Sequence, residues 1–226
     1  MTGDRPIRAV LFDCDGTLVD SEPIWLATVC DAIAALPDGP AITLQFSDIE
    51  GQSMARSLAI VEERRGRPLP VDFEASVRAE MARRFETDLR EIPGATALLT
   101  ALDKLCMPFC VASNGPRDKI ALVLRLTGLD RFVPPSRIFS AADLGRYKPD
   151  PVLFLHAAEA MGVEPAACAV VEDSRAGIEA GLNAGMAVFA YRPHGLPPWP
   201  ADPRVRPISH LSDLPAGLMA MAIAST

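Results

Sequence analysis

Four short apolar runs, three of which end in a cluster of polar residues, limit the fold of this chain more than any other feature. The polar clusters are residues 13–16, 113–115 and 172–174. Runs of this length are typical of buried strands that stop at a polar loop. The four runs are residues 9–12, 109–112, 169–171 and 187–189.

Helical patterns lie between these runs. Apolar residues recur at helical spacing over residues 98–105, 120–127 and 153–161, and Gly128 and Gly162 close the last two patterns. Strands that alternate with helices predict a parallel sheet of the α/β class. Ligands bind such sheets outside the carboxyl ends of the strands, where the polar clusters would meet.

A long stretch after the first polar cluster breaks this alternation. Residues 21–91 contain no convincing apolar strand and at least three helical patterns. One of these patterns repeats an apolar residue every four positions from Phe73 to Leu89. We therefore expect an inserted helical domain between two parts of the sheet domain, residues 1–20 and 92–226.

Charge and hydropathy exclude several classes of partner. The chain of 226 residues has a net charge of −7 and no basic block, which argues against nucleic acid as a partner. It has no stretch near the roughly 20 apolar residues of a membrane helix. Its first residues lack the features of a signal peptide, so we expect a cytoplasmic protein without membrane contact.

The cysteines and histidines do not indicate a zinc site. The five cysteines show no paired CxxC spacing, and none is followed six positions later by the arginine that a cysteine-based phosphatase needs. The three histidines are far apart in the sequence. We expect reduced thiols and no zinc.

The polar clusters, with one loop between them, supply Asp13-Cys14-Asp15-Gly16-Thr17, Ser113-Asn114, Lys148 and Glu172-Asp173 in that order. Together they offer a nucleophile, a hydroxyl group, a cation and metal ligands at the ends of different strands. This ordered set resembles the motifs of the haloacid dehalogenase superfamily of phosphatases and mutases. The resemblance implies a doubly wound α/β catalytic core, residues 1–20 and 92–226, with residues 21–91 as an α-helical cap domain.

The resemblance also implies catalytic roles. Asp13 would attack phosphorus, since a carboxylate is ionised at neutral pH and forms an acyl phosphate that water can hydrolyse. Asp15 would protonate the departing oxygen and then deprotonate the attacking water. Lys148 would neutralise charge between Asp13 and the phosphoryl oxygens, which Ser113 and Asn114 help to bind.

The implied cofactor is Mg²⁺, which prefers about six oxygen ligands and keeps several waters. Asp13, the backbone carbonyl of Asp15 and Asp173 would provide the protein ligands. Glu172 would stand behind these ligands or reach the ion through a water.

Other phosphoryl-transfer classes fit the chain less well. In a response-regulator receiver domain the acidic pair precedes the phosphorylated aspartate, whereas Glu172-Asp173 comes last here. A non-catalytic binding protein would not need every catalytic position intact. Phosphonate hydrolysis would need a cap lysine, and residues 1–103 contain none.

A sugar phosphomutase of the β-phosphoglucomutase type is the alternative that stays open. Residues 51–53 resemble that branch, in which a basic residue typically follows to grip the second phosphate. This chain has Met54 there. The sequence therefore favours a phosphatase over a mutase.

The substrate is expected to be a small phosphorylated metabolite, either a sugar phosphate or a phosphosugar acid. Residues 78–83, 111–116 and 157–161 resemble the bacterial 6-phosphogluconate phosphatase group. A carboxylated substrate would want a second cation, because a guanidinium can grip a carboxylate with two hydrogen bonds. The candidates are Arg56, Arg83, Arg84 and Arg117, and the sequence does not indicate an oligomeric state.

Overall fold

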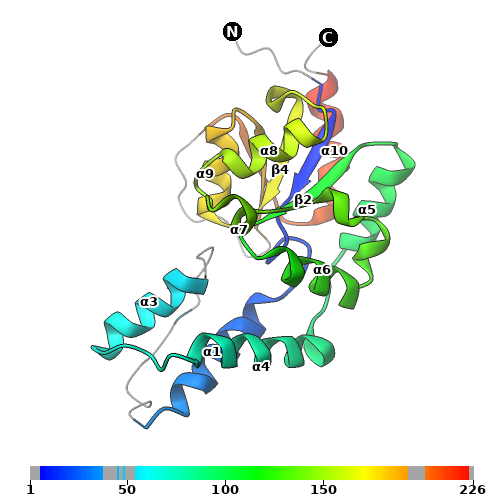
Figure 1. Ribbon diagram of the computed structural model, residues 1–226. Helices are drawn as coiled ribbons and strands as arrows, with labels where there is room; N and C mark the ends of the chain where they lie inside the picture. The colour runs from blue at the N-terminus through cyan, green and yellow to red at the C-terminus, as the bar shows by residue number, and fades with distance from the viewer. Residues whose placement is uncertain (1–5, 38–44, 46–47, 49–53, 193–201, 224–226) are drawn as a thin grey trace. The chain divides into compact units, whose positions relative to one another are not determined.

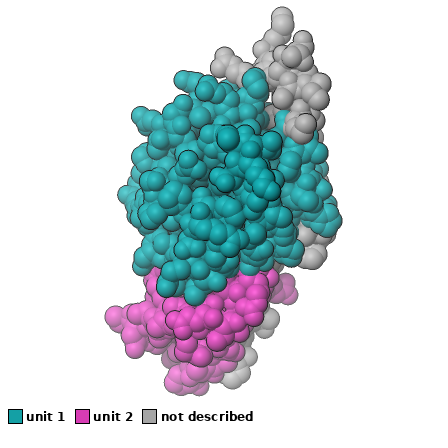
Figure 2. Space-filling view, turned by 90° about the vertical axis from the view of Figure 1, so that its right-hand side faces the viewer, with its two compact units in different colours: residues 1–19, 91–226 teal, residues 20–90 magenta. Residues whose placement is uncertain are grey.

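The computed structural model describes residues 6–37, 45, 48, 54–192 and 202–223. The chain forms two compact units, which are residues 1–19 with 91–226 (unit 1) and residues 20–90 (unit 2) (Figure 2). The insertion expected from the sequence, residues 21–91, differs from unit 2 by one residue at each end. The function of unit 2 as a cap stays a prediction.

Unit 1 is built on a six-stranded sheet of order β3-β2-β1-β4-β5-β6, in which every neighbouring pair is parallel. β1 lies in the middle, so its carboxyl end is flanked by those of β2 and β4. The predicted parallel α/β fold is confirmed. The strands are β1 Ala9–Phe12, β2 Phe109–Ser113, β3 Ile138–Ser140, β4 Cys168–Glu172, β5 Ala187–Tyr191 and β6 Val205–Ile208.

Helices cover both faces of this sheet (Figure 1). α8 and α9 pack on the face that carries Leu11 and Val170, which belong to a continuous buried cluster. α10 packs on the other face, where a Cβ on Gly217 would lie 2.5 Å from the Phe189 ring. The helices of unit 1 are α5 Ala95–Lys104, α6 Arg117–Leu126, α7 Ala141–Leu144, α8 Val152–Ala160, α9 Arg175–Asn183 and α10 Leu214–Ile223, with 3₁₀ turns at Leu129–Arg131, Pro135–Arg137, Pro165–Ala167 and Leu211–Asp213.

Unit 2 contains α1 Glu22–Ala34, α3 Met54–Arg65 and α4 Phe73–Asp88, and its described residues form no strand. α1 packs against α4. The predicted apolar stripe of α4 is buried, from Phe73 to Phe85. Residues 51–53, on which the mutase resemblance rests, lie outside the described residues, and Met54 begins α3.

Two strands were absent from the sequence prediction. β3 has only three residues, and β6 carries Arg206 and Pro207, which do not form an apolar run. Proline is tolerated at the edge of a sheet because an edge strand leaves N–H groups unpaired. Over the part of the chain that the structure describes, no helix is long and apolar enough to cross a membrane.

Candidate active site

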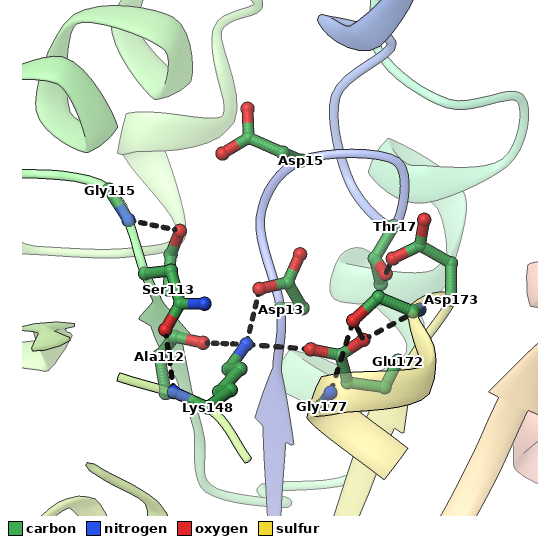
Figure 3. A network of polar contacts seen from close by, with 12 residues as sticks. Asp13, Asp15, Thr17, Ala112, Ser113, Gly115, Lys148, Glu172, Asp173 and Gly177 are labelled. Atoms are coloured by element: carbon green, nitrogen blue, oxygen red, sulfur yellow. Dashed lines mark hydrogen bonds and ion pairs between the residues drawn. The ribbon is translucent and has the colours of Figure 1, made fainter. Parts of the chain in front are cut away.

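The polar loops after β1, β2 and β4 meet at the carboxyl edge of the sheet, and we call this place the candidate site (Figure 3). Asp13 directly follows β1, and its backbone N–H donates to the carbonyl of Val171 in β4 at 2.9 Å. Ser113 and Glu172 end the two flanking strands. Strand order therefore brings together residues that are far apart in the sequence.

A buried ion-pair cluster forms the centre of the candidate site. Lys148 Nζ lies 2.5 Å from Asp13 Oδ1 and 2.7 Å from Glu172 Oε1, and it donates to the Ala112 carbonyl at 2.9 Å. Only 2% of the Lys148 side chain is exposed. An ammonium group has three N–H donors, so these three acceptors use all of them.

Burial is the largest influence on the pKa values of Asp13 and Lys148. It raises the pKa of Asp13 to about 7, because desolvation and the carboxylates of Glu172 and Asp15 outweigh the stabilising charge of Lys148. Burial opposes the charged form of Lys148, but Asp13 and Glu172 raise the pKa of this lysine above its usual value. Lys148 therefore stays charged, while Asp13 gives up its proton only near neutral pH.

Glu172 is held by the start of α9. Its Oε2 accepts hydrogen bonds from the Ser174 backbone N–H at 2.8 Å and from Ser174 Oγ at 2.9 Å. Ser174 caps α9 by accepting from the Gly177 N–H at 3.1 Å. A Cβ on Gly177 would lie 1.8 Å from Glu172 Oε1, so this position requires glycine. Both oxygens of Glu172 are thus engaged, one of them by Lys148.

Replacing Gly177 by Ala is expected to push Glu172 away from Lys148. Overpacking of this kind costs about 1–3 kcal/mol of stability, and a buried ion pair would be disturbed as well. Thermal unfolding should show a lower Tm for this variant than for Glu179→Ala, which removes only an exposed ion pair on the same helix. An unchanged Tm in Gly177→Ala would contradict the close approach.

Asp173 lies over the loop that follows β1. Its Oδ1 accepts a hydrogen bond from Thr17 Oγ1 at 3.0 Å. Gly16 has a φ of +78°, and a Cβ there would lie 2.2 Å from Asp173 Oδ2. Glycine is therefore required both by the backbone conformation and by the carboxylate beside it.

The donor set fits a hard cation such as Mg²⁺, which favours oxygen ligands. The predicted ligands are the carboxylates of Asp13 and Asp173 and the backbone carbonyl of Asp15. No group of three or more acidic, histidine or cysteine side chains in the described part of the chain is arranged as a metal site. The predicted set does not need one, since its third ligand is a backbone oxygen.

Ser113 and Asn114 organise the loop after β2. The Gly115 N–H donates to Ser113 Oγ at 3.1 Å, and the Gly115 carbonyl accepts from Ser140 Oγ at 2.7 Å. Asn114 Oδ1 accepts from the backbone N–H of Lys148 at 3.0 Å. Asn114 therefore ties the loop of Ser113 to the loop of Lys148, and its Nδ2 is the amide donor that a phosphate could use.

Asp15 has a partner that the sequence prediction missed. Its carboxylate is turned away from Asp13 (Figure 3) and accepts a hydrogen bond from Lys119 Nζ, in the first turn of α6. Burial opposes the charge on Lys119, but Asp15, Cys14 and Asp13 raise the pKa of this lysine. Lys119 is one of three lysines in the chain, and its place just after the Ser113 loop was the only sequence signal.

The four arginines that the sequence offered as a second cation are each paired with carboxylates. Solvent screens pairs of this kind, so they contribute little to stability. The pairs are Arg56 with Glu63, Arg83 with Glu80, Arg84 with Glu80 and Asp31, and Arg117 with Asp143.

The family model described as haloacid dehalogenase-like hydrolase matches residues 7–185 of the chain. The chain belongs to this family. The predicted family resemblance is thereby confirmed, and the motif residues named above lie within the matched range.

Several curated relatives of this haloacid dehalogenase-like hydrolase bear the names of phosphatases. The chain is 41% identical to 6-phosphogluconate phosphatase of Escherichia coli (strain K12), over 92% of this chain and 93% of that protein. It is 32% identical to hexitol phosphatase A of the same strain, over 81% and 82%. A HAD family hydrolase of Deinococcus radiodurans R1, solved with bound phosphate and sodium, is 30% identical and matches with a TM-score of 0.75 over 96% of this chain and 97% of that one.

Proposed function

We propose that this hydrolase is a Mg²⁺-dependent phosphatase that acts on a small phosphorylated metabolite through a phospho-aspartate intermediate on Asp13. The observation that carries this proposal is the buried pair of Lys148 Nζ and Asp13 Oδ1, 2.5 Å apart, at the carboxyl end of the central strand. A carboxylate held in this way is fixed in direction and faces a cation that can offset phosphate charge. The phosphatase names of the curated relatives support the same class of reaction.

In the first step, an oxygen of Asp13 forms a bond to phosphorus while the bond from phosphorus to the ester oxygen breaks. Lys148 holds the other oxygen of the Asp13 carboxylate, so the attacking oxygen is directed away from the lysine. Ser113 and the N–H groups of its loop would bind the phosphoryl oxygens. Asp15, protonated from solvent water before this step, gives its proton to the leaving oxygen, which departs as an alcohol.

In the second step, water attacks the phosphorus of the acyl phosphate and gives a proton to Asp15. The Asp13–phosphorus bond breaks, inorganic phosphate leaves and the Asp13 carboxylate is restored. The same two carboxylates thus serve both steps, one as nucleophile and one as proton carrier.

Mg²⁺ would be held by Asp13, Asp173 and the Asp15 carbonyl, and it supplies positive charge to the phosphoryl oxygens when bound. The charge balance of the candidate site supports this cofactor. Four carboxylates, Asp13, Asp15, Glu172 and Asp173, accompany the two ammonium groups of Lys119 and Lys148. A divalent cation would balance them.

Removing Mg²⁺ is expected to lower turnover by at least about 100-fold, because a metal ion contributes several kcal/mol to stabilising the charge of the reaction. Phosphate release should be measured after treatment with a chelator and again after Mg²⁺ is added back. Recovery of the rate on adding Mg²⁺, but not on adding K⁺, is the expected result. A rate that the chelator leaves unchanged would contradict a metal-dependent reaction.

The substrate that we propose is a phosphosugar acid, with 6-phosphogluconate first, because one relative bears the name of this activity. Phosphate release should be measured across sugar phosphates, phosphosugar acids and nucleotides. Glucose 1,6-bisphosphate should be tested in parallel for interconversion with its monophosphates. Interconversion without net phosphate release would replace the phosphatase with the mutase alternative, and no release from any compound would exclude the proposed substrate class.

Two further proposals concern the setting of the reaction. Unit 2 is proposed to act as a cap, as its insertion after the Asp13–Thr17 motif suggests.

The five cysteines are free thiols, which agrees with the reducing cytoplasm that we propose as the location.

A further inference from the structure

Lys119 brings a second ammonium group to the carboxyl edge of the sheet, beside that of Lys148. Its Nζ contacts Asp15, and 21% of its side chain is exposed. The aliphatic part of the side chain runs along the Ser113 loop, since Lys119 Cδ lies 3.5 Å from the place that a Cβ on Gly115 would take. The ammonium group is therefore placed both by the phosphate-binding loop and by the proposed proton carrier.

Lys148 cannot easily serve a second anionic group of the substrate. Its three N–H donors are taken by Asp13, Glu172 and the Ala112 carbonyl. Any further contact would break one of these bonds in a buried cluster. Losing a partner of a buried charge is far more costly than losing one in an exposed pair.

Asp15 links Lys119 to the leaving group. In the proposed reaction, Asp15 must take a proton from solvent water and turn from Lys119 toward the ester oxygen, to which it gives that proton. The ammonium group then loses this carboxylate while most of its side chain is buried, which favours binding of another anion in its place. A leaving group that carries its own carboxylate supplies that replacement, whereas a neutral sugar or polyol does not.

We propose that Lys119 is the specificity-determining cation of the site, and that it binds the carboxylate of a phosphorylated hydroxy acid in exchange for Asp15. This inference rests on the proposed phosphatase function and narrows its substrate class. In the sequence analysis, four arginines were the candidates for binding the substrate carboxylate. The inference gives this role to Lys119 in α6 instead. The exchange couples recognition of the leaving group to release of the group that protonates it.

The test compares carboxylated with neutral substrates in the variant Lys119→Met. The ratio of kcat/KM for 6-phosphogluconate to that for sorbitol 6-phosphate should fall by about 30-fold, which corresponds to about 2 kcal/mol. Most of the change should appear in KM for the carboxylated substrate. Because both rates come from one preparation, the ratio does not depend on how much of the variant is folded.

Two other variants sharpen the comparison. Lys104→Met makes the same substitution at an exposed lysine of α5 and should keep the wild-type ratio. Lys119→Arg keeps the positive charge and should retain most of the preference for the carboxylated substrate. Lys119→Gln should lose the preference as Lys119→Met does.

Three outcomes would overturn parts of this assignment in different ways. Equal losses for both substrates in Lys119→Met would mean that Lys119 acts only through Asp15, and the specificity role would be wrong. A wild-type enzyme that favours the neutral substrate would also contradict it. A wild-type enzyme that hydrolyses neither compound would instead defeat the proposed function on which the inference rests.

Discussion

Asp13→Asn is expected to abolish turnover while leaving the fold intact. The amide cannot attack phosphorus, and removing a covalent nucleophile typically lowers kcat by roughly 10⁴-fold or more. Phosphate release and circular dichroism should be measured together, with Asp130→Asn at an exposed position as the matched control. Substantial residual turnover in Asp13→Asn would contradict a phospho-aspartate intermediate.

The same variant has an expected effect on stability in the absence of metal. Burial raises the pKa of Asp13 to about 7, so the folded protein disfavours the ionised carboxylate that the unfolded chain tolerates above pH 4. Ionised Asp13 is therefore destabilising above pH 7, and this effect fades as the pH falls through 7 toward 4. Metal-free Asp13→Asn should accordingly have a higher Tm than the wild type at pH 8, with a smaller difference at pH 5.

Lys148→Met is expected to damage both activity and folding. The substitution leaves Asp13 and Glu172 buried without their shared cation, and breaking a buried pair in this way costs about 3–5 kcal/mol. For a chain of this length the expected fall in Tm is about 10 °C. The loss of charge at the nucleophile should lower kcat by a further factor of about 100 or more in the protein that remains folded.

Thermal unfolding and initial rates at a temperature below both transitions would separate the two effects of Lys148→Met. Lys104→Met is again the matched control, because its side chain lies on an exposed part of α5. A variant at Lys148 that kept the wild-type Tm would show that the buried cluster contributes little to stability. Wild-type kcat in that variant would exclude Lys148 from the reaction.

The sheet could be predicted from sequence because its central strands are short apolar runs buried on both faces. β1, β2, β4 and β5 have that composition. β3 is too short to stand out, and β6 has the polar composition that an edge strand permits. Sequence composition therefore predicts the central strands of the sheet but not the strands at its edges.

The grouping of the candidate site residues also followed from the order of strands and loops. Asp13 directly follows β1, Ser113 and Glu172 end the neighbouring strands, and parallel strands place such residues at one edge. Lys119 could not be found in this way, because it lies inside a helix where a lysine is common on a solvated face. Its contact with Asp15 depends on the conformation of a flexible side chain, which the spacing of residues in the sequence does not predict.

The sequence likewise did not predict that Gly177 belongs to the candidate site. Gly177 lies in the first turn of α9, where glycine is common enough that the sequence does not indicate a constraint. The structure supplies the constraint, which is the Glu172 carboxylate where a Cβ would be. A carboxylate that supports Lys148 thus depends on a residue that has no side chain.

The central position of β1 has a consequence for how the enzyme tolerates local unfolding. The Ser113 loop and Lys119 come from the β2 side of the sheet, while Glu172 and Asp173 come from the β4 side, and both groups meet only across the end of β1. Neither half of the sheet holds all of the proposed catalytic residues. Enzyme activity should therefore report on partial unfolding of the sheet. We expect activity to be lost when one half of the sheet separates, even while the other half keeps its secondary structure.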